Sequence, residues 1–212
     1  MSMLRTLITV SLLVYSIVGL VAPQPSIDVG QTTANVFEST YFHFRYELPK
    51  GWFALDDRVR LADNKNRYET QLQEALKNKK PNTSTQTTTV EVFPPYNLLI
   101  ASRTAVTSSD TGQMPRVEIH AIRRVAMMME AGDSVKLISQ IMRPKVLRGP
   151  EDVTLSGHKF VRADFEFKPD SFLSKFTTVS GDYLIEFDLR ADNEKDLGDL
   201  ANTVQAIQFS DH

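Results

Sequence analysis

The feature that most constrains the fold of this chain is the alternation of apolar and polar side chains in three short segments. These segments cover residues 41–48, 116–124 and 160–167. A repeat of two residues is typical of a β-strand with one face buried and the other exposed. The apolar faces predicted in this way are Phe42, Phe44, Tyr46 and Leu48; Val117, Ile119 and Ala121; and Val161, Ala163, Phe165 and Phe167.

Further strands are predicted from short apolar or β-branched runs between turn residues. They cover residues 97–107, 153–155, 175–179 and 183–189. Ser180-Gly181-Asp182 separates the last two and predicts a tight hairpin turn.

Three segments have the apolar spacing of helices. The first is predicted to begin at Asp56 or Asp57 and to run to about Lys80. A short second helix opens at Asp133 and stops before Pro144, and Asp192 or Asn193 caps a final helix. The apolar stripe predicted for the first helix is Leu61, Tyr68, Leu72, Ala75 and Leu76, and that of the last includes Leu197, Leu200, Ala201, Val204 and Ile207.

The order of these elements is strand, helix, two strands, helix, strand, hairpin and helix. Strands joined by hairpins, with helices between them, favour an antiparallel sheet with helices packed on its faces. The expected fold class is therefore α+β.

The N-terminus predicts a segment separate from this domain. Arg5 is followed by an uncharged stretch that lasts to Ile27, and its apolar part ends at Ala22. Residues 1–22 are expected to be a signal peptide or an N-terminal membrane anchor, and residues 23–35 a flexible tether. Residues 36–212 are expected to form a single α+β domain. The expected location is outside the cytoplasm: periplasmic, secreted or anchored to the membrane.

Composition excludes several kinds of partner and site. The chain has no cysteine, so disulfides, thiolate metal sites and cysteine nucleophiles are excluded. Its formal net charge of -2 argues against a nucleic-acid partner, which would favour a basic surface. Contact with a membrane is expected only through the N-terminal segment.

No catalytic, cofactor-binding or metal-ligating residue is predicted, and no cofactor. The histidines are widely spaced and lack the partners of a zinc motif. Acidic residues near the last helix are expected to favour the helix N-terminus rather than to bind calcium. These histidines and acidic residues are His43, His120, His158 and His212, and Asp192, Glu194, Asp196 and Asp199.

Three other sequence features could have either a functional role or a purely structural one. Trp52 is expected to pack in the core rather than to stack on a ligand. Met127-Met128-Met129 is expected to fill the core, with a partner groove as the alternative. Asn82-Thr83-Ser84 fits a glycosylation sequon.

Four local motifs, in this order and spacing, resemble those of the photosystem II PsbP / Mog1-like α/β/α sandwich superfamily. They span roughly Val36 to Phe209. The resemblance implies a non-enzymatic binding or assembly module, and it carries over no functional residue. The motifs are Leu48-Pro49-Lys50-Gly51-Trp52, Gly157-His158-Lys159-Phe160, Gly181-Asp182-Tyr183-Leu184-Ile185 and Ala206-Ile207-Gln208-Phe209.

The leading expectation is thus an extracytoplasmic binding or assembly module with an unknown protein partner. One alternative is a carrier of a small apolar molecule or lipid, with Phe42, Phe44 and Tyr46 lining its pocket. Another is a hydrolase, which would need acidic and histidine side chains together in a shielded cavity. The candidates for that cavity are Asp164, Glu166, His120 and His158.

Overall fold

The computed structural model of the chain describes residues 29–78, 92–109, 112–125, 130–168 and 170–210. The predicted leader, the first part of the tether, Met127–Met129, Asn82 and His212 lie outside these residues. No helix within the described ranges has both the length and the apolar character needed to cross a bilayer.

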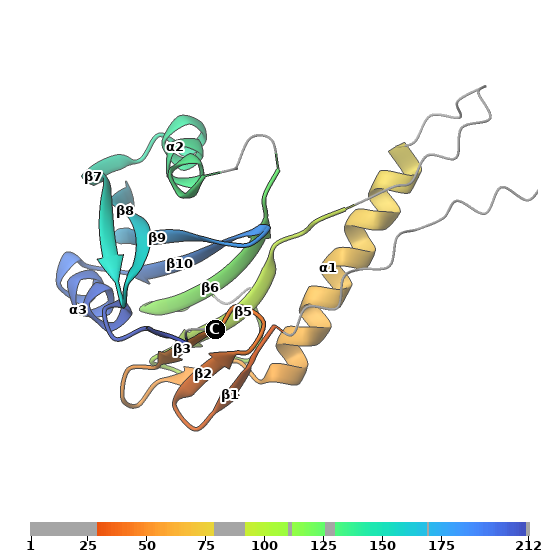
Figure 1. Cartoon of the computed structure of the whole chain (residues 1–212), viewed down its shortest axis with the longest axis horizontal. Helices are drawn as coiled ribbons and strands as arrows, with labels where there is room; N and C mark the ends of the chain where they lie inside the picture. Colours follow the sequence, from red (N-terminus) through yellow and green to blue (C-terminus); the bar gives the residue numbers. More distant parts are fainter. Residues whose placement is uncertain (1–28, 79–91, 110–111, 126–129, 169, 211–212) are drawn as a thin grey trace, which may run out of the picture.

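The described residues form three helices distributed among eleven strands (Figure 1). The helices are α1 (Asp57–Asn78), α2 (Ala131–Met142) and α3 (Glu194–Val204). The strands are β1 (Gln31–Thr33), β2 (Val36–Ser39), β3 (Phe44–Glu47), β4 (Phe53–Ala54), β5 (Tyr96–Ser102), β6 (Arg116–Arg123), β7 (Lys145–Leu155), β8 (His158–Lys168), β9 (Ser171–Ser180), β10 (Tyr183–Ala191) and β11 (Gln208–Phe209).

These strands make two sheets in which every pairing is antiparallel. The larger sheet has the order β4-β5-β6-β10-β9-β8-β7, and the smaller has the order β1-β2-β3-β11. The predicted fold class is therefore confirmed: the protein is an α+β sandwich built on an antiparallel sheet.

The main core lies between the two sheets and beneath α3. Phe44 of β3 lies against Phe187 of β10, with 5.7 Å between ring centroids. Leu200 and Val204 of α3 are buried in the same cluster. A smaller cluster on the opposite face of the large sheet holds α2, so helices cover both faces. Its buried members are Val135, Ala163, Phe165 and Leu173.

The folded domain begins earlier than predicted. Val29 is buried in the main core, and Gln31–Thr33 form β1, although both lie in the segment assigned to the tether. Gly30 has a φ of +82°, and a Cβ there would meet Glu38 O at 2.5 Å. Gly30 therefore makes a tight approach to β2, and residues 29–33 belong to the folded domain rather than to the expected tether.

Strand β7 is much longer than the predicted residues 153–155. It lies at the edge of the large sheet, and most of its side chains are exposed. Its register against β8 shifts on both sides of Arg148. An edge strand with little buried surface has no apolar period to detect, which explains the missed prediction.

Helix α1 has the predicted bounds but does not pack through its predicted apolar stripe. Leu61 is 49% exposed and Leu76 is 37% exposed. The buried side chains are instead Arg60 and Asn64. Polar contacts with the backbone therefore hold this helix against the sheet, whereas apolar packing holds α3.

Candidate functional site

One face of the large sheet carries a row of charged side chains. The register places Glu186 opposite His120 and Asp188 opposite Glu118 on neighbouring strands β10 and β6. On the other side of β10, Lys175 of β9 lies opposite Asp188. Because side chains alternate along a strand, these five groups share one face, the face that also carries α2.

Lys175 is the centre of this row and is 2% exposed. Its ammonium donates to Glu186 Oε2 at 2.5 Å and to Asp188 Oδ1 at 2.7 Å. Burial acts to lower the pKa of Lys175, but the two carboxylates outweigh it and the pKa is raised. Burial raises the pKa of Asp188, and the opposing charges of Lys175, His120 and Arg190 bring it below its usual range. The lysine is therefore held in its charged form.

Two arginines complete the row. Arg116 pairs with Glu118 Oε1, and Arg190 Nε donates to Glu118 Oε2 at 3.0 Å. Arg190 Nη2 also lies 3.6 Å from Asp188 Oδ2. The row thus contains three cations and three carboxylates, so its charges cancel. We call these six residues the ion-pair cluster: Arg116, Glu118, Lys175, Glu186, Asp188 and Arg190.

His120 lies beside the ion-pair cluster and is half-buried. Its Nδ1 lies 3.0 Å from Asn97 Oδ1. Because an amide oxygen can only accept, this contact places a proton on Nδ1. Burial lowers the pKa of His120, and the nearby Asp188 and Glu118 only partly offset it. The ring is therefore expected to be neutral at pH 7.

Asn97 joins this histidine to helix α1. Its backbone N–H donates to Asn64 Oδ1 at 2.9 Å, and its carbonyl accepts from Asn64 Nδ2 at 3.0 Å. The same carbonyl accepts from Arg60 Nη1 at 3.2 Å. The pairing of β5 with β6 is irregular between Asn97 and Leu99. The irregular position thus offers backbone groups to the helix and a side-chain oxygen to His120.

Glu118, His120 and Asp188 have the proximity expected of a metal site. One ligand atom from each lies within 4.8 Å of the others. Every oxygen of the two carboxylates, however, already pairs with Arg116, Arg190 or Lys175. A divalent cation here would meet three paired positive charges, so these carboxylates are better matched to the ion-pair cluster than to a metal.

A cleft of about 430 Å³ opens over the His120 end of this row. Helix α1 forms one wall, and strands β5 and β6 form the floor. We call it the polar cleft, because each described residue that lines it is polar: Asp63, Asn66, Arg67, Asn97, Ser109, Arg116, Glu118 and His120.

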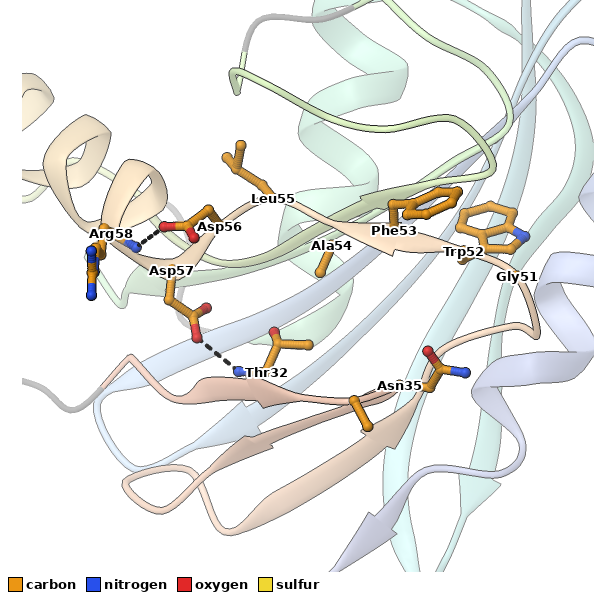
Figure 2. Close-up of a pocket in the computed structure, with 11 residues that line it drawn as sticks. Thr32, Asn35, Gly51, Trp52, Phe53, Ala54, Leu55, Asp56, Asp57 and Arg58 are labelled. Carbon is orange, nitrogen blue, oxygen red and sulfur yellow. Dashed lines mark hydrogen bonds between the residues drawn. The ribbon is translucent and has the colours of Figure 1, made fainter.

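A second hollow of about 570 Å³ lies between β1 and the segment that leads into α1 (Figure 2). Trp52 lines it but is only 8% exposed and belongs to the main core, whereas the neighbouring Phe53 is 53% exposed. Asp57 crosses the hollow to accept from the Thr32 backbone N–H at 2.9 Å. The core placement predicted for Trp52 is thus observed, and this contact occupies the edge of β1.

The four candidate residues of a hydrolase do not meet. The sheet register puts Asp164 on the face opposite His120, where it pairs with Arg162 at 2.9 Å. Glu166 pairs with the exposed Lys145, and His158 stacks on Phe209 with 3.8 Å between ring centroids. The shared cavity that this alternative needed is therefore not formed by these four residues.

Two of the four acidic residues near the last helix lie at its N-terminus. Asn193 is the N-cap and accepts from the backbone N–H of Asp196 at 2.8 Å. Glu194 and Asp196 lie in the first turn, where negative charge opposes the helix dipole.

Comparison with known proteins gives a weak structural similarity and no family. No family model matches it, and no curated protein matches it. Among solved structures, it is similar to the solution structure of cyanobacterial PsbP (CyanoP) from Synechocystis sp. PCC 6803, with 11% sequence identity and a TM-score of 0.46. The similarity covers 88% of this chain and 100% of that chain.

Proposed function

We propose that this chain is a non-enzymatic binding module that works outside the cytoplasm, and that the polar cleft is its binding site. The observation that carries the proposal is the floor of the cleft. Arg116 and Glu118 of the charge-balanced ion-pair cluster line that floor, in a sheet whose other face packs in the main apolar core.

The same cluster argues against catalysis. A general base or nucleophile needs a group that is free to react. Lys175 is tied to two carboxylates, and the carboxylate oxygens of Glu118 and Asp188 are paired with cations. The ring of His120 is oriented by Asn97 at 3.0 Å. The reactive atoms of the lysine and of both carboxylates are therefore already engaged, and His120 is held in one orientation.

The apolar-carrier alternative has less support. It required Phe42, Phe44 and Tyr46 to line a pocket, yet each of them is at most 2% exposed and is packed in the main core. Location outside the cytoplasm is supported by the apolar N-terminal segment.

Native mass spectrometry of the full chain, purified from its source under mild conditions, tests the binding role. We expect a retained molecule that is lost in Asn66→Ala, a change confined to the cleft wall, and kept in Gln73→Ala, an exposed position on the same helix. A retained molecule that survives Asn66→Ala, or a bare mass together with no binding in a broad small-molecule screen, would overturn the proposal.

The absence of catalysis is tested separately with chromogenic esters, amides, phosphates and glycosides. We expect no turnover above that of the His120→Ala variant. Turnover that disappears in this variant would show that the cleft is an active site.

A further inference from the structure

The residues that line the polar cleft constrain the chemistry of its ligand, and this inference rests on the proposed binding role. Among the described residues that line the cleft, none is aliphatic, and the imidazole of His120 is the sole aromatic ring. A sugar or a nucleobase gains much of its affinity by stacking on broad aromatic surfaces, and a lipid needs an apolar wall. The lining therefore favours a small, strongly polar ligand.

The charged side chains that line the cleft restrict the chemical class of the ligand further. Asp63 and Glu118 are acidic, and Arg67 and Arg116 are basic, so the formal charges of the described lining residues cancel. An anion would be repelled by two carboxylates, and a cation would be repelled by two guanidinium groups. A ligand that carries both charges can satisfy both.

Two of these four charges are available to a ligand. Arg116 and Glu118 pair with each other on the floor. On the wall, Asp63 has no ion pair within the described residues. Arg67 has only a long 3.5 Å contact with Asn64 Oδ1 there. Both side chains line the cleft. The charges that a ligand can contact are therefore those of Asp63 and Arg67 on α1, whereas the charges of the floor pair with each other.

The spacing on α1 sets these two groups side by side. Asp63 and Arg67 are four residues apart, which brings their Cβ atoms to about 5–6 Å on one face of a helix. Asn66 lies on the same face and supplies a neutral amide. The carboxylate of a ligand can accept a charge-assisted hydrogen bond from the guanidinium of Arg67, while an ammonium group of the same ligand donates to the carboxylate of Asp63.

The wall is also held in place before any ligand arrives. Arg60 Nη2 donates to Gly30 O at 2.7 Å and to Asp57 Oδ1 at 2.8 Å. Asn64 makes paired bonds with the Asn97 backbone. A positioned wall reduces the entropy lost on binding.

We propose that the polar cleft binds a small zwitterion of the amino-acid class, with its carboxylate on Arg67 and its ammonium on Asp63. The volume of about 430 Å³ accommodates a free amino acid with bound water.

The test is a titration of the full chain with each free α-amino acid, followed by amide chemical shifts. Acetate and methylammonium serve as half-ligands at the same concentrations. We expect at least one amino acid to shift the amides of Asn66, Asn97 and His120 saturably. Each half-ligand should bind about tenfold or more weakly, because it loses one charge-assisted contact.

Matched variants assign the two charges. Asp63→Asn and Arg67→Gln should each weaken amino-acid binding by about tenfold or more, while Lys65→Gln, 72% exposed on the same helix, should leave it unchanged. Binding of a half-ligand as tight as the amino acid, or equal loss in Lys65→Gln, would overturn the zwitterion assignment.

The two proposals fail in different ways. If no amino acid binds but phosphate, acetate or a monosaccharide shifts the same amides, the zwitterion assignment is wrong and the binding module stands. If no compound of any class shifts these amides and the purified protein retains nothing, both proposals are wrong.

Discussion

At the scale of single residues, His120 links the chemistry of the site to the stability of the protein. Its pKa is lowered in the folded state, chiefly by burial. An unfolded histidine titrates near pH 6.5, so between that pH and the lower folded pKa the unfolded state binds more protons. Stability supplied by the neutral ring is therefore complete above about pH 6.5 and is lost as the pH falls through this window.

We therefore expect the free energy of unfolding to fall between pH 7.5 and pH 5.0, and to fall less in His120→Gln. Urea denaturation at both pH values measures this difference. His158→Gln is the matched control, because His158 stacks on Phe209 away from the charged row. An identical decrease in the wild type and in His120→Gln would contradict the lowered pKa.

Lys175 provides a second prediction at this scale. Lys175→Met leaves Glu186 and Asp188 buried without their shared cation, and breaking such a pair costs about 3–5 kcal/mol. Urea unfolding measures the loss. The triple variant Lys175→Met, Glu186→Gln, Asp188→Asn removes the unpaired charges as well, and should recover more than half of that stability. A single variant as stable as the wild type would show that the ion pairs contribute nothing.

At the scale of elements, α1 is attached by hydrogen bonds rather than by an apolar face. Arg60→Met removes the donors to Val29 O, Gly30 O and Asn97 O, which are then left without this partner. Losing a buried charged hydrogen-bond donor costs about 2–4 kcal/mol. We expect faster amide hydrogen exchange throughout α1, measured by mass spectrometry. Arg58→Met, on the exposed side of the same helix, should leave the exchange unchanged.

The elements also show how far the sequence could predict this fold. Strand β6 has a buried face at Val117, Ile119 and Ala121, and residues 116–124 display its period. Strand β10 is buried on both faces, and it could be predicted from its apolar run after a tight turn. Helix α3 could be predicted with its cap because Asn193 precedes an apolar stripe that is buried. Strand β7 has no buried face over most of its length, and β4 is only Phe53–Ala54, so neither leaves a detectable period.

The site was harder to predict than the fold. Glu118 and His120 form the polar side of their strand, which is ordinarily the solvent side. Their partners Glu186, Asp188 and Lys175 come from other strands, and only the register of three strands brings them together. Charged residues alternating on β6 and also on β10 were the available signal. Without the strand order, nothing in the sequence showed that these two polar faces adjoin.

At the scale of the whole molecule, the N-terminal boundary of the domain can be tested. A chain beginning at Val36 lacks β1, the buried Val29 and two of the carbonyls that accept from Arg60. We expect it to be less stable than a chain beginning at Ile27 by about 3 kcal/mol or more. Parallel urea denaturation of the two chains measures this. Equal stability would mean that residues 29–35 act as a tether after all.

The broken register of β7 has a consequence for the protein in crowded solution. An open sheet edge is a template on which further molecules can add strands and grow fibres. Here the outermost strand carries two irregularities around Arg148, a proline at Pro150 that has no N–H to offer, and outward charges. Neighbouring molecules therefore find no regular ladder to extend, and the larger sheet can end in solvent without seeding polymers.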